Sequence, residues 1–153
     1  MSCSGLQYLT PNDWVLIRAK GQKRMFRLGE EIIHQGDWCD SLFIIRDGEA
    51  SVEVASTGAR TILAWLGPGD ICGDMAFLEQ GRYTAAVVAK DERVEVDEIN
   101  AHELRGLLDG FAGLASRFYH SMSLVLVQRL RATSSELARE MALRDKFSNS
   151  SQE

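Results

Sequence analysis

Between residues 24 and 99, glycine and aspartate divide the chain into short apolar segments, and this pattern constrains the fold more than any other feature. The segments are rich in Val, Ile, Phe and Trp. Short strands with turn signals at this spacing predict an antiparallel sandwich, barrel or jelly roll. The predicted strands are 25–28, 31–35, 42–46, 51–55, 61–66, 84–89 and 93–99.

Helix signals flank this β region on both sides. Thr10, followed by a proline and an acidic first turn, predicts a helix that ends by Gly21. Asn100 and Glu103 have the spacing of a capping box, so a second helix should run from there to about Gly110.

A third, much longer helix is predicted over residues 111–146, which contain no proline and a single glycine. A helix of about 30 residues is about 45 Å long, more than a domain of this size buries against itself. The apolar residues at helical spacing are Met122, Leu126, Leu130, Leu137 and Met141. This stripe approaches a heptad seam and predicts a homodimer through the same helix of a second copy. The alternative is a helix that folds back on its own barrel.

Size and charge limit the possible classes of protein. The 153 residues suffice for one domain, and the net charge of −5 disfavours nucleic acid binding without sequence preference. We find no membrane-spanning run and no signal peptide, so we expect a cytoplasmic protein without membrane association. The three cysteines lack metal-site spacing and the histidines are isolated, so we expect no metal.

The segment 69–89 holds the strongest functional signal. It predicts a strand end, a glycine turn at Gly73, one helical turn and a new strand, an arrangement that directs backbone N–H groups at a small anion. With Gly29, Gly36 and Gly48 before it, the chain resembles the cyclic-nucleotide-binding domain family of catabolite activator protein and protein kinase A regulatory subunits.

The resemblance implies a mainly β fold with flanking helices: a β-roll, or double-stranded jelly-roll barrel, followed by a long C-terminal helix. It divides the chain into the roll with its N-terminal helix at 1–110, the dimerisation helix at 111–146 and a loose tail at 147–153. In the family, the cassette N–H groups and an arginine hold the cyclic phosphate, a Ser or Thr follows that arginine, and a glutamate binds the ribose hydroxyl. The residues implied to bind ligand are Gly73, Asp74, Met75, Ala76, Arg82, Tyr83, Thr84, Thr133 and Ser134.

Two positions depart from the family pattern. Asp74 stands in the glutamate position with a side chain one methylene shorter, and Tyr83 stands where arginine is usual. A phenol offers phosphate one neutral donor in place of a charged fork, which predicts weak binding. Arg82, in the family's proline position, replaces that arginine only if a bulge or turn redirects it, because neighbouring extended residues point to opposite faces. Otherwise Arg82 is a solvated loop charge.

We therefore expect a sensory or regulatory domain whose ligand is cyclic AMP or another cyclic nucleotide, with no further cofactor and no catalytic residues. The alternative is a degenerate domain that binds no ligand and serves as a dimeric scaffold. Too few residues follow the long helix for a DNA-binding segment, so a DNA-reading regulator would need a longer chain.

Overall fold

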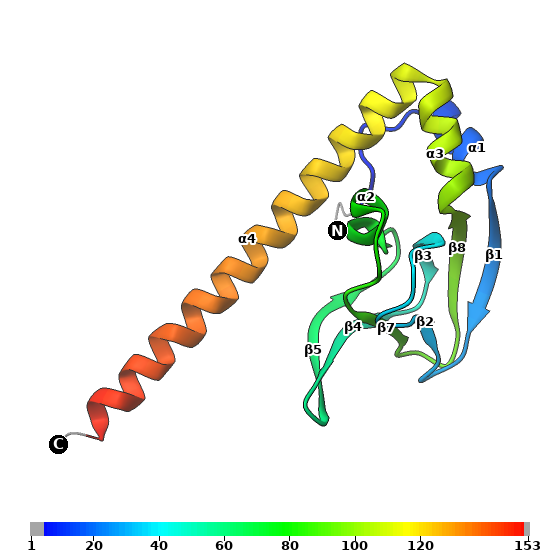
Figure 1. The fold of residues 1–153 in the computed structure, drawn as a ribbon. Coiled ribbons are helices and arrows are strands. Elements are labelled where there is room, and N and C mark those ends of the chain that lie inside the picture. Colours follow the sequence, from blue (N-terminus) through cyan, green and yellow to red (C-terminus); the bar gives the residue numbers. More distant parts are fainter. Residues whose placement is uncertain (1–4, 152–153) are drawn as a thin grey trace.

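The computed structural model describes residues 5–151, which form two antiparallel four-stranded sheets with helices at one end and a long C-terminal helix (Figure 1). The strands are β1 (Gly21–Phe26), β2 (Glu31–Ile33), β3 (Ser41–Asp47), β4 (Ala50–Ser56), β5 (Ala59–Leu66), β6 (Ile71–Cys72), β7 (Ala86–Ala89) and β8 (Val94–Asn100). The helices are α1 (Pro11–Arg18), α2 (Asp74–Glu79), α3 (Ala101–Gly110) and α4 (Ala112–Ser150). This arrangement confirms the predicted fold class.

The strand order is β1-β8-β3-β6 in the first sheet and β2-β7-β4-β5 in the second. Gly48 makes a corner between β3 and β4 with φ of 86°, and a Cβ there would lie 2.7 Å from the carbonyl oxygen of Arg93. A side chain at this corner would therefore clash with the backbone.

Two predicted elements differ from the observed ones. The first strand begins at Gly21, earlier than the predicted 25–28. The sequence does not mark its first part as a strand because Gln22, Lys23 and Arg24 are exposed on an edge strand. Those residues lack the apolar alternation that marks a half-buried strand, and their pairing with β8 fixes them instead. The two-residue strand β6 is too short to carry a pattern of its own.

Two hydrophobic clusters hold the molecule together. The first lies between the sheets and includes Phe26, Phe43 and Ile45. The second includes Leu42 and Ile99 of the first sheet together with residues from α1, α3 and the first part of α4. The roll and its helices therefore pack as one body.

The first part of α4 belongs to this body. Phe118 and Met122 are almost fully buried, and Arg117 donates two hydrogen bonds of 2.6 and 2.8 Å to the buried Asp13 of α1. These bonds hold the pKa of the Asp13 carboxyl well below its usual range. The prediction that Met122 faces a partner helix is wrong, since its side chain packs into the core of its own chain.

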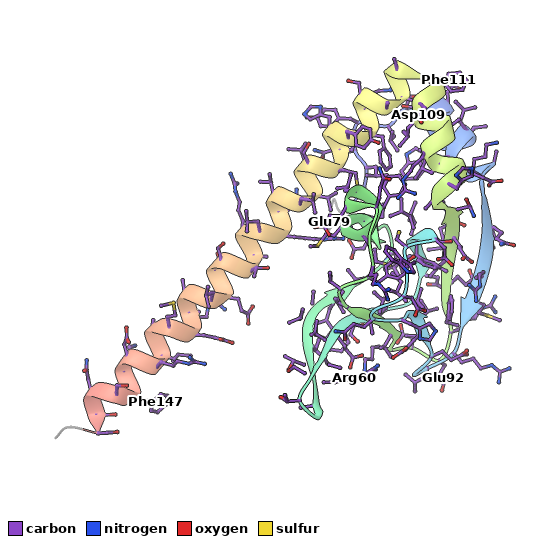
Figure 2. All side chains as sticks on the ribbon, viewed as in Figure 1. Arg60, Glu79, Glu92, Asp109, Phe111 and Phe147 are labelled. Atoms are coloured by element: carbon purple, nitrogen blue, oxygen red, sulfur yellow. The ribbon has the colours of Figure 1, made fainter. Side chains whose placement is uncertain are left out.

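The second part of α4 extends away from the roll, as Figure 1 shows, and every residue from 131 to 151 is exposed. Leu130, Leu137 and Met141 are 67%, 57% and 58% exposed, and Phe147 near the end is 73% exposed (Figure 2). The helix continues through Ser150, so residues 147–150 are helical where a loose tail was expected; neither glycine nor proline stands there to end the helix. Within residues 5–151, no helix is long and apolar enough to span a bilayer.

Candidate ligand-binding site

The cassette lies where β6 ends and α2 begins. Gly73 precedes α2 with φ of 84°, and a Cβ there would lie 3.2 Å from the carbonyl oxygen of Ser41 and 3.3 Å from the Tyr83 ring. The first N–H groups of α2 have no carbonyl partner within the helix. Glycine thus permits both the turn and the close packing that present these donors at the predicted phosphate position.

Asp74 is already engaged by the long helix. Its side chain is 3% exposed, and both of its carboxylate oxygens lie 2.7 Å from Nη1 of Arg129 in α4. Arg129 also donates to the carbonyl oxygen of Ile71 through Nη2. The carboxylate in the family's ribose-binding position is therefore ion-paired to the helix that is expected to form the dimer.

Tyr83 is buried beside the cassette, and its hydroxyl is bound to the backbone of β3. It donates to the carbonyl oxygen of Ser41 at 2.6 Å and accepts from the Ser41 N–H at 3.2 Å. Burial raises the pKa of the phenol well above its usual range, so the group stays neutral. In this conformation the phenol supplies no charge to the cassette, and its O–H is taken by Ser41.

Arg82 lies on the surface, on the loop between α2 and β7. Its Nη1 donates to the carbonyl oxygen of Gly36 at 3.1 Å, and its guanidinium lies 4.6 Å from the centroid of the exposed Trp38 ring. Arg82 is exposed while Tyr83 is buried, as expected for neighbours in an extended segment.

The remaining predicted residues are spread over the cassette and α4. Ala76 is buried beneath the turn, whereas Met75 and Thr84 are exposed. Thr133 donates from its hydroxyl to the carbonyl oxygen of Arg129, 2.9 Å away and one turn earlier in α4, and it is exposed like Ser134. The structure thus brings Gly73, Asp74, Ala76 and Tyr83 together, and leaves Thr133 and Ser134 on the solvent-exposed part of α4.

Arg129 is a site residue that is absent from the set predicted from the sequence. The spacing along the helix could have identified it, because Arg129 precedes Thr133 by four residues and therefore lies on the same face of α4. Two thiols lie close to the site: Cys39, whose Sγ is 3.9 Å from the Gly73 carbonyl oxygen, and the buried Cys72. Burial raises the pKa of Cys72 to about 12, so this thiol is unreactive at neutral pH. The described residues contain no cluster of three or more metal-binding side chains.

Comparison with known proteins agrees with this geometry. The family model described as "Cyclic nucleotide-binding domain" matches residues 23–111. The cyclic AMP receptor protein of Thermus thermophilus is 28% identical over 130 residues, which cover 84% of this chain and 58% of that protein. The cyclic GMP-binding protein C of Dictyostelium discoideum is 31% identical over 137 residues, which cover 84% of this chain and 5% of that protein.

Comparison with solved structures also points to the cyclic-nucleotide-binding fold. The crystal structure of the Thermus thermophilus catabolite activator protein superposes with a TM-score of 0.71 at 26% identity, covering 87% of this chain and 61% of that chain. The chain therefore belongs to the cyclic-nucleotide-binding domain family. It spans little more than half the length of its cyclic AMP receptor relative.

Proposed function

We propose that this chain is a sensory domain that binds a cyclic nucleotide, with cyclic AMP as the first candidate, and transmits its occupancy to α4 of a homodimer. The observation that carries the proposal is the pair between Asp74 of the cassette and Arg129 of α4. It links the carboxylate in the ribose-binding position to the helix that would carry the signal. The names of two relatives, a cyclic AMP receptor and a cyclic GMP-binding protein, support this ligand class.

In this proposal the N–H groups of the Gly73–Ala76 turn hold the cyclic phosphate, and the exposed hydroxyl of Thr84 donates beside them. The ribose hydroxyl donates to Asp74. A carboxylate has about four acceptor positions. Asp74 can therefore accept this bond while Arg129 keeps its contact with the carboxylate or moves to a different one of its oxygens. The ligand therefore changes the contact between cassette and α4, and it biases the helix by the difference between its affinities for the two arrangements.

The affinity should be modest. Removing the charged donor that faces a bound phosphate costs about 2–5 kcal/mol of binding free energy. This loss corresponds to a Kd that is higher by a factor of roughly 30 to several thousand. Tyr83 supplies no charge, and Arg82 is held by Gly36 and Trp38. We expect cyclic AMP to bind in the micromolar range or more weakly.

The homodimer is supported by the exposed apolar side chains of Leu130, Leu137 and Met141 on the part of α4 that leaves the roll. The exposed stretch of α4 is about 30 Å long at 1.5 Å per residue. A second copy of α4 would cover this surface, and it would bring the partner's Thr133 and Ser134 toward a ligand at the cassette.

A second candidate is a scaffold that binds no nucleotide. It is favoured by the hydroxyl of Tyr83, which is committed to Ser41. In this case α4 would still form a dimer, and the Asp74–Arg129 pair would be a structural tie.

Thermal unfolding with a ligand panel separates the two candidates. A ligand present at 100 times its Kd adds about 2.7 kcal/mol to stability, which for a domain of this size raises Tm by roughly 5–10 °C. We expect this shift with cyclic AMP or cyclic GMP and its loss in Asp74→Asn. Asp109→Asn, at the exposed end of α3, is the matched control. No shift with cyclic AMP, cyclic GMP or cyclic di-GMP would favour the scaffold.

A further inference from the structure

A cavity lies away from the cassette, on the first sheet. Its volume is about 720 Å³, and residues of α1, β1, β3 and β8 line it. Asp74 and Tyr83 are not among the lining residues. We call this concave surface the β1 shelf and define it by its cationic residues Arg18, Lys23, Arg24, Arg46 and Arg93.

The β1 shelf carries positive charge on an acidic protein. Its five cationic side chains are accompanied in the lining by two carboxylates, Glu95 and Asp97, while the whole chain has a net charge of −5. Arg93 pairs with Glu95, and Arg46 lies 3.3 Å from Asp97. Arg24 pairs with Glu98 at 2.9 Å. Within residues 5–151, Arg18 and Lys23 form no ion pair with a carboxylate, and the Arg18 guanidinium lies 5.3 Å from the centroid of the Trp14 ring. These two side chains carry the charge that is open to a ligand.

The cations of the shelf are exposed rather than enclosed. The side chains of Arg24, Arg46 and Arg93 are 48%, 37% and 64% exposed. Each solvent-exposed ion pair contributes little to affinity, so a small anion that touches one or two of them would bind poorly. A longer ligand can add apolar and backbone contacts to these ion pairs.

The spacing of the shelf matches an extended peptide. Lys23 and Met25 lie opposite Asp97 and Glu95 in the antiparallel ladder, and they share one face because they are two residues apart. Met25 is 56% exposed, so it offers an apolar contact next to the charge of Lys23. β1 is also the edge strand of its sheet, which leaves one row of its backbone groups open for pairing.

We propose that the β1 shelf docks an extended acidic segment of a partner protein beside β1. Carboxylates of the segment meet Arg18 and Lys23, and an apolar side chain next to the second carboxylate packs on Met25. Backbone hydrogen bonds to the edge of β1 supply affinity, and the alternating side chains supply specificity. A peptide is favoured over a nucleic acid because its backbone can pair with the open edge of β1. This inference does not depend on the ligand of the cassette.

Fluorescence anisotropy with the full chain and a labelled peptide of alternating Glu and Leu tests the proposal. We expect binding at low salt that weakens as salt rises, and no binding of the peptide with Lys or Gln in place of Glu. Arg18→Glu/Lys23→Glu should weaken binding at least about tenfold, or about 1.4 kcal/mol. Arg144→Glu/Lys146→Glu, on the exposed part of α4, changes the net charge equally and should leave binding unchanged.

Circular dichroism and Tm confirm that both double variants are folded. Three results would overturn the proposal: equal binding of the Glu and Gln peptides, equal weakening by the two double variants, or no binding of the Glu peptide at low salt. Tighter binding of pyrophosphate or of a labelled single-stranded oligonucleotide to the same residues would also overturn it. The shelf would then be a small-anion or nucleic acid site.

Discussion

Replacing Arg129 by Gln tests the contact between the cassette and α4. The variant removes the positive charge that faces the Asp74 carboxylate, whose side chain is only 3% exposed. The two 2.7 Å contacts between Nη1 of Arg129 and the Asp74 oxygens are lost. Breaking a buried ion pair costs about 3–5 kcal/mol. Because the Arg129 side chain is itself 36% exposed, solvent replaces part of the interaction, and we expect a loss of about 2–3 kcal/mol in the free energy of unfolding.

The double-mutant cycle gives the sharper measurement. Asp74→Asn alone should cost less, about 1 kcal/mol, because the partly exposed guanidinium can be solvated. The double variant Asp74→Asn/Arg129→Gln leaves a neutral pair, so its loss should be smaller than the sum of the single losses by at least about 1 kcal/mol. Urea denaturation at pH 7 measures all three variants against the parent.

Arg131→Gln is the control, since Arg131 lies on the same helix and is exposed. It should change stability by no more than about 0.5 kcal/mol. Losses that add within about 0.3 kcal/mol in the double variant would show that the two side chains do not interact. The proposal that the Asp74–Arg129 pair couples the cassette to α4 would then be refuted.

Three further predictions concern other parts of the molecule. Leu130→Glu/Leu137→Glu should convert a dimer to a monomer by light scattering, whereas Leu28→Glu, at an equally exposed site on the roll, should not; an unchanged mass would contradict the helix dimer. Tyr83→Arg should tighten cyclic AMP binding at least about tenfold in calorimetry. It should also lower the stability of the ligand-free protein, because the Ser41 backbone loses its hydrogen-bond partner. Unchanged affinity would count against this position as a phosphate contact. The lowered pKa of Asp13 means that its carboxylate stabilises the fold above the pKa of the unfolded chain, near 4, and that this contribution is lost as pH falls further toward the folded pKa. Asp13→Asn should therefore cost about 2 kcal/mol at pH 7 and flatten the loss of stability below pH of about 4, and a variant with an unchanged acid transition would argue against the Asp13–Arg117 pair.

The sequence was sufficient for the roll and the cassette because local rules determine both. Gly48 and Gly73 mark positions where the backbone takes a positive φ, and Thr10 and Asn100 cap their helices as predicted. Asn100 accepts from the N–H of Glu103 at 2.9 Å, which is the first half of the predicted capping box.

The long-range contacts of the site could not be predicted in the same way. Helical periodicity shows which residues of the 39-residue α4 share a face, but not where along its length the helix meets the cassette. Periodicity therefore places Met122 on the dimer stripe, although it packs in the core, and it gives no reason to single out Arg129 as the partner of Asp74. The partner of the Tyr83 hydroxyl is a backbone group 42 residues earlier in the chain, a contact that no local pattern encodes.

The most direct test of cyclic AMP binding at the cassette is a calorimetric titration of the full chain, beside the same titration of Asp74→Asn. We predict saturable binding in the micromolar range or weaker for the parent, and at least about tenfold weaker binding for the variant. Nanomolar binding that Asp74→Asn leaves unchanged would contradict the assigned site. Saturation by no cyclic nucleotide at all would contradict the sensory function itself.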